Sequence, residues 1–136
     1  MNRIIYRNDA NGVSIIIPTG PVELALKDVP KGAPYEIVDE ADIPTDRTFR
    51  DAWVMGDCCI DHDMDRCKTI GHEMRRAARA VEFAPHDEVI AKQIPGVDAA
   101  AAEAQRQRIR DKYAIIQEQI DAAESANDIK TALGIS

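Results

Sequence analysis

The sequence predicts an α+β fold, with a small antiparallel β-part at residues 1–55 followed by a helical part at residues 56–136. Two observations separate these parts. Five of the seven prolines, but only five of the twenty alanines, lie before residue 56. After residue 60, apolar residues recur every three or four positions, which is the period of a helix.

The β-part begins with a predicted hairpin. Two β-branched runs, Arg3–Arg7 and Val13–Ile17, flank a five-residue loop that contains an Asn-Gly pair. Such a pair tolerates positive φ, as hairpin loops require. Glu23–Lys27 fits one helical turn, and Tyr35–Val38 is rich in β-formers and predicts a third strand. An isolated hairpin is marginal in water, so this third strand or a partner surface is needed.

Residues 48–54 fit two local structures, a strand or a helical turn capped by Asp46. In the helical case, Phe49 and Trp53 lie four positions apart and share one face. Both are large apolar residues beside the change in composition. We therefore expect Phe49 and Trp53 to be interface residues that pack the sheet against the helical part.

The helical part predicts a hairpin of two long helices, at about 60–83 and 98–124. The apolar residues of the first helix step by three and four, as in a coiled coil, and Pro85 is expected to limit this helix. Ser125, followed three residues later by Asp128, predicts the start of a short C-terminal helix.

The second long helix carries a narrow stripe of bulky apolar residues on a background of Ala, Gln and charged residues. This stripe is a candidate interface, and it consists of Ile109, Tyr113, Ile116 and Ile120. Its narrowness suits a coiled-coil seam. We favour pairing with residues 60–83 of the same chain. Association with the same helix of other copies, which would make a homo-oligomer, remains the alternative.

Residues 58–67, with His72 beyond them, contain the residue types that bind metals. Their spacing does not match a zinc finger or knuckle, and the D-x-D-x-D run lacks the glycine and glutamate of a calcium loop. We therefore expect no metal and no other cofactor. Cys58 or Cys59 could form a disulfide between subunits in an oxidising environment. No catalytic constellation is found, so no catalytic residue is assigned and the protein is not expected to be an enzyme.

Charge and hydropathy exclude two classes of partner. The formal net charge is −7 and the pI is about 4.9, whereas nucleic-acid binding needs clustered positive charge. No apolar run approaches the roughly 20 residues that span a bilayer. The first residues lack the apolar region of a signal peptide. We expect no nucleic-acid or membrane partner and a location in the cytoplasm.

Residues 29–53, VPKGAPYEIVDEADIPTDRTFRDAW, resemble a segment shared by small tail-associated proteins of tailed bacteriophages, which include tail assembly chaperones and tail-fibre assembly proteins. Arg75–Arg79 and Ala126–Leu133 are similar to the helical end of that family, whereas the cysteines and histidines of residues 56–72 depart from it.

The resemblance implies a non-enzymatic protein that acts in tail or tail-fibre assembly through contacts with a phage tail or tail-fibre protein, in the host cytoplasm. One alternative is a structural component of the tail in the mature virion. An alternative of another class is a host-directed phage inhibitor protein.

Overall fold

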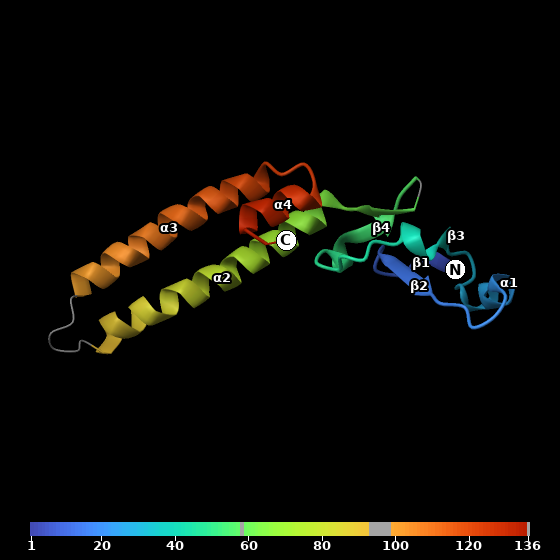
Figure 1. The fold of residues 1–136 in the computed structure, drawn as a ribbon, viewed down its shortest axis with the longest axis horizontal. Helices are drawn as coiled ribbons and strands as arrows, with labels where there is room; N and C mark the ends of the chain where they lie inside the picture. The colour runs from blue at the N-terminus through green and yellow to red at the C-terminus, as the bar shows by residue number, and fades with distance from the viewer. Residues whose placement is uncertain (58, 93–98, 136) are drawn as a thin grey trace. The chain divides into compact units, whose positions relative to one another are not determined.

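The computed structural model describes residues 1–57, 59–92 and 99–135 (Figure 1). It has 57% helix and 16% strand, with the strands first and the long helices after them, which confirms the predicted α+β class. The chain forms two compact units, Met1–Arg66 and Cys67–Ser136. The boundary lies later than the expected one at 55/56, because residues after 55 add a strand to the first unit.

The first unit contains a three-stranded antiparallel sheet. Strands β1 (Asn2–Arg7), β2 (Val13–Ile16) and β3 (Tyr35–Asp39) lie in the order β2-β1-β3. The β1–β2 hairpin is confirmed, and Asn11 has the positive φ of 56° in its loop. The side chain of Asn8 accepts hydrogen bonds from two backbone N–H groups of this loop, which holds the tight turn.

The rest of the first unit consists of short elements. They are α1 (Val22–Ala25), β4 (Trp53–Met55), β5 (Ile60–His62) and three 3₁₀ turns, η1 (Leu26–Asp28), η2 (Glu40–Asp42) and η3 (Arg50–Ala52). Both alternatives for residues 48–54 are therefore partly realised, as a 3₁₀ turn followed by a strand. The Asp46 carboxylate accepts a hydrogen bond from the N–H of Thr48 at 3.0 Å, so it caps a turn before η3.

One face of the sheet carries the core of the first unit. Ile5, Val13 and Val38 pack there with Trp53, and all four side chains are buried. They come from β1, β2, β3 and β4, so the core joins the sheet to the β4–β5 pair. Burial of these large apolar groups is the main stabilising term for a unit of this size.

The second unit is helical. Helix α2 (Met64–Lys92) begins in the last residues of the first unit, and α3 (Ala99–Asp121) and α4 (Ala126–Leu133) follow it. The prediction of a helix over 60–83 was wrong at both ends. Ile60 pairs with β4 as part of β5, and α2 continues through Pro85. Proline has no N–H, so the carbonyl of Val81, four residues earlier, loses its helical hydrogen bond. Pro85 is exposed and Val81 is 73% exposed, so water can replace this bond.

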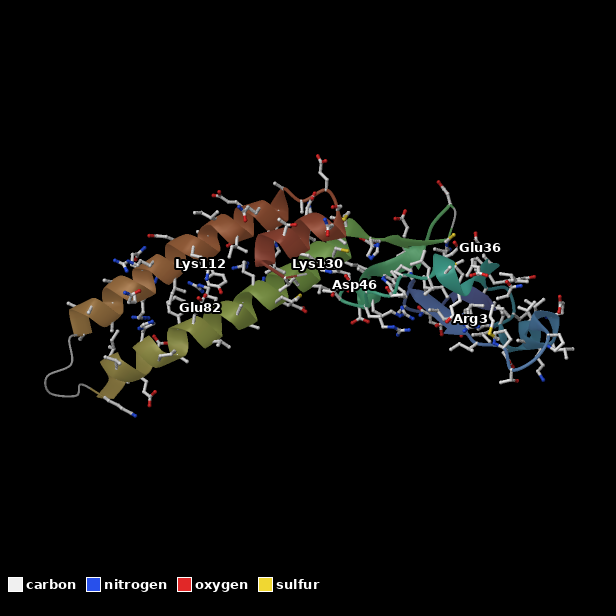
Figure 2. The ribbon with its side chains drawn as sticks, viewed as in Figure 1. Arg3, Glu36, Asp46, Glu82, Lys112 and Lys130 are labelled. Atoms are coloured by element: carbon white, nitrogen blue, oxygen red, sulfur yellow. The ribbon has the colours of Figure 1, made fainter. Side chains whose placement is uncertain are left out.

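Helices α2 and α3 form an antiparallel hairpin within one chain, as we favoured from the sequence (Figure 1). The Nζ of Lys112 on α3 lies 2.9 Å from the Oε1 of Glu82 on α2, and the two side chains point toward one another in Figure 2. The Nζ of Lys68 donates to the carbonyl of Asp121 at 2.9 Å. The second contact ties the start of α2 to the end of α3.

Helix α4 packs against both long helices at Gly71. A Cβ at this position would lie 2.7 Å from the Cγ2 of Ile129 on α4 and 3.4 Å from the Cγ2 of Ile120 on α3. Both isoleucines are fully buried. Glycine thus allows close approach of three helices. The predicted cap of α4 is confirmed, since the Oγ of Ser125 accepts a hydrogen bond from the N–H of Asp128 at 3.1 Å.

Candidate interaction site

Strand β3 is an edge of the sheet, because β1 pairs with one side of it and no described strand pairs with the other. The N–H of Arg7 donates to the carbonyl of Pro34, just before β3, at 3.0 Å. Bonded and non-bonded residues alternate along an antiparallel pair, so the even-numbered residues of β3 bond to β1. The N–H and C=O groups of Tyr35 and Ile37 therefore point outward from the sheet.

The side chains of Tyr35 and Ile37 are also exposed, by 50% and 44%. They lie on the sheet face opposite Trp53, because their cross-strand partners are Tyr6 and Ile4, the neighbours of the core residue Ile5. Ile4 is fully buried in the same face, and α1 lies against β1. The middle of this face is thus covered, while its β3 end stays open.

Carboxylates follow the same edge. Residues 35–42 contain no lysine or arginine, and their acidic residues are Glu36, Asp39, Glu40 and Asp42. The Nη2 of Arg3 lies 3.2 Å from the Oε2 of Glu40. Arg3 on β1 and Glu36 on β3 can both be located in Figure 2. The pKa of Asp39 is lowered, chiefly because its carboxylate accepts the N–H of Ala41. The edge is therefore acidic at neutral pH.

The predicted interface residues Phe49 and Trp53 are buried in the first unit, with exposed fractions of 3% and 0%. Trp53 belongs to the core of the sheet. The guanidinium of Arg50 lies 4.6 Å from the centre of the Trp53 ring and donates from Nη2 to the carbonyl of Val13 at 2.7 Å. Burial lowers the pKa of Arg50. Trp53 is thus a core residue of the first unit and presents no surface of its own.

The predicted stripe of α3 is largely internal to the second unit. Ile109, Tyr113 and Ile120 are buried, and Ile116 is half-buried. Tyr113 is a hydrogen-bond partner of Glu82 on α2, and burial, followed by this carboxylate, raises the pKa of Tyr113 to about 12. Three of the four residues therefore stabilise the hairpin, and they offer little area to another copy of the chain.

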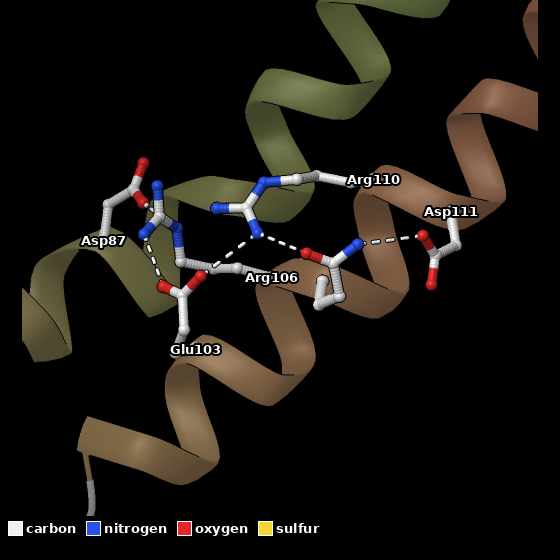
Figure 3. A network of polar contacts seen from close by, with 6 residues as sticks. Asp87, Glu103, Arg106, Arg110 and Asp111 are labelled. Carbon is white, nitrogen blue, oxygen red and sulfur yellow. Dashed lines mark hydrogen bonds and ion pairs between the residues drawn. The ribbon is translucent and has the colours of Figure 1, made fainter.

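Arginines of α3 form a charged network with α2 (Figure 3). The Nε of Arg106 lies 2.9 Å from the Oδ1 of Asp87, as an ion pair without the alignment of a hydrogen bond, and its Nη1 donates to Glu103 at 2.7 Å. Arg110 donates to the other oxygen of Glu103 at 3.0 Å. Arg106 also lies 5.7 Å from the centre of the Phe83 ring. The guanidinium of Arg106 is thus held by ion pairs with Asp87 and Glu103.

A second polar cluster lies near the other end of the hairpin. The Nε2 of His72 lies 2.8 Å from the Oδ1 of Asp121, and the Nε of Arg75 donates to the Nδ1 of His72 at 3.2 Å. Because Nδ1 accepts, the proton of a neutral His72 is on Nε2 and faces Asp121. Arg75 is buried, and this burial lowers its pKa. The cluster joins α2 to α3.

The cysteine- and histidine-containing stretch is divided between a hairpin and a helix. Cys59 is half-buried beside β5, and Cys67 is buried in α2. Within residues 1–57, 59–92 and 99–135, no three His, Cys, Asp or Glu side chains gather closely enough for a metal ion. Cys58, the other candidate for an intersubunit disulfide, lies outside the described residues.

Two features of the structure were not predicted from the sequence. The open side of β3 was not recognised, although apolar residues at both odd and even positions of Tyr35–Val38 indicate a strand with two apolar faces. The β4–β5 pair was also missed. Its signal is Gly56, a turn residue after a short apolar run, where a Cβ would lie 2.8 Å from the Cβ of Asp61.

Comparisons of the chain with family models, with curated proteins and with solved structures give no match. In the described part of the chain, no helix combines the length and the apolar character needed to cross a membrane.

Proposed function

We propose that this chain is a non-enzymatic bacteriophage tail-associated protein that acts in tail or tail-fibre assembly through protein–protein contacts. The resemblance of residues 29–53 to small phage tail-associated proteins supports this proposal. The partner is a phage tail or tail-fibre protein, and the contact takes place in the host cytoplasm during assembly.

The observation that carries the proposal is the open edge of β3, which lies inside the segment with the resemblance. Tyr35 and Ile37 expose apolar side chains and outward backbone groups there. A free strand edge with apolar side chains is a surface that another protein chain can extend. A protein that acts through contacts needs such a surface.

The use of the cationic side chains also supports an action through contacts. Arg50 and Arg66 donate to backbone carbonyls of the first unit, at 2.7 Å and 3.1 Å. Arg106 and Arg110 pair with carboxylates of the hairpin. These guanidinium groups, which would otherwise suit phosphate or nucleic-acid binding, stabilise the fold instead.

The test is to locate the protein and its partners in phage-producing cells. An affinity-tagged chain is purified from the lysate, and purified particles are analysed by mass spectrometry in parallel. An assembly factor is expected to bind a tail or tail-fibre protein in the lysate and to be absent from particles. Presence in particles would instead show a structural tail component. Recovery of host proteins alone would contradict both and would favour a host-directed inhibitor.

A further inference from the structure

We propose that the β3 edge binds an extended segment of the partner as an added β-strand, and that apolar residues alternate with lysine or arginine in this segment. The inference rests on the proposed function only for the source of the segment. The binding mode itself follows from the backbone, the side chains and the charge of β3.

The backbone supplies the first argument. The even-numbered residues that flank β3 in the sequence both face β1. Pro34, just before β3, accepts from the N–H of Arg7, and the N–H of Glu40, just after β3, donates to the carbonyl of Met1 at 2.9 Å. Tyr35 and Ile37 thus present outward donors and acceptors at the spacing of a β-ladder. The opposite edge differs, because the outward carbonyl of Val13 on β2 already accepts the hydrogen bond from Arg50. The β3 edge is therefore the more open of the two.

The side chains supply the expected pattern of the added strand. Tyr35 and Ile37 are exposed on one face, where apolar side chains of a neighbouring strand would pack beside them. Glu36 lies on the opposite face, beside the buried Val38. A lysine or arginine of the added strand would lie next to Glu36 on that face. Alternation of the two faces gives alternation of apolar and basic residues.

Charge argues for a basic partner and against a second copy of this chain. Two of the four carboxylates of residues 35–42 have a cation nearby, Glu40 with Arg3 and Asp39 with the amino group of Met1. Glu36 and Asp42 form no ion pair in the part of the chain that the structure describes. Pairing of two β3 strands would bring both acidic sets to one edge, where like charges destabilise the pair.

The test is a nuclear magnetic resonance titration of the full-length isotope-labelled protein with synthetic peptides. The probe is Lys-Val-Lys-Val-Lys-Val-Lys, with blocked ends. The same peptide with Glu in place of Lys tests charge, and a version with Pro in place of the central Val tests backbone pairing. Only the basic peptide without proline is expected to shift the amides of Tyr35, Ile37 and Asp39 and to slow the exchange of the outward Ile37 N–H.

Two variants separate backbone pairing from other contacts. Ile37→Pro removes an outward donor that β1 does not use, and it is expected to weaken binding about tenfold. The matched Ile37→Thr variant keeps this N–H and should bind much more tightly than Ile37→Pro. If Ile37→Pro does not fold, Glu36→Gln serves as the second variant, and it is expected to reduce the preference for the basic over the acidic peptide.

Equal binding of the basic and acidic peptides, or shifts confined to α2 and α3, would overturn the proposal. So would the absence of any shift at β3. Concentration-dependent dimerisation that the Ile37→Pro variant loses would show that a second copy occupies the edge. The titration contains no phage component, so its failure leaves the role in tail assembly open, and failure to find a tail partner leaves the peptide result unchanged.

Discussion

Replacement of Trp53 by alanine removes the largest side chain in the core of the first unit. Trp53 is fully buried against Ile5, Val13 and Val38. Truncation of such a residue costs about 3–5 kcal/mol, because the transfer free energy is lost and a cavity remains. The loss of the Arg50 contact, at 4.6 Å from the ring centre, adds about 0.5–1 kcal/mol.

Hydrogen exchange measures this effect separately in each unit. Ile5 reports on the sheet, and Ile120 reports on the helical hairpin. A loss of 3–5 kcal/mol accelerates exchange that occurs through unfolding by roughly a hundredfold to a few thousandfold. We expect this acceleration at the Ile5 amide in Trp53→Ala. Unchanged exchange at Ile5 would refute the assignment of Trp53 to the core of the sheet.

Trp53→Phe is the matched control. It retains an aromatic ring in the cavity, and the indole N–H that it removes has no hydrogen-bond partner among the described residues. The substitution therefore breaks no hydrogen bond to a described residue, and the expected cost is about 1–2 kcal/mol. A cost equal to that of Trp53→Ala would show that the N–H has an important partner and that volume is not the main term.

Three predictions concern the helical unit. Gly71→Val should lower the free energy of unfolding by about 1–3 kcal/mol in chemical denaturation, because its side chain would overlap Ile129; unchanged stability would refute the three-helix contact. In an ultraviolet titration, one phenol should ionise near pH 12 and be missing in Tyr113→Phe. Because the pKa of Tyr113 is raised, its contribution to the free energy of unfolding is complete below pH 10 and is lost between about pH 10 and 12, as charge develops against Glu82. Identical ultraviolet titrations of the unmodified chain and Tyr113→Phe would contradict this assignment. Ser125→Ala should cost about 1 kcal/mol and speed amide exchange in α4, and full protection there would show that the cap is dispensable.

Local patterns predicted the elements whose stabilising contacts are close in sequence. The β1–β2 hairpin is predictable from its loop, because the side chain of Asn8 accepts a hydrogen bond from the loop backbone and Asn11 adopts the positive φ. The start of α4 follows from Ser125 and the N–H that it caps. In each case the residues that determine the structure lie within a few positions of each other, so a short window of sequence contains the necessary information.

Elements that depend on distant partners were harder to predict. Ile60 fits the helical period, yet it pairs with Met55 in the β4–β5 hairpin. Pro85 was expected to end α2, but the helix continues where the exposed backbone can bond to water. The open edge of β3 depends on the order β2-β1-β3, which the pattern of a single strand does not encode.

Photocrosslinking from the β3 edge in phage-producing cells tests the central claim most directly. A photoreactive aromatic amino acid replaces Tyr35, which is half exposed, and a control chain carries it at the exposed Ala104 of α3. We predict a cross-link from position 35, but not from position 104, to a tail or tail-fibre protein of the phage. Cross-links to host proteins alone, or the same products from both positions, would contradict a role of this edge in tail assembly.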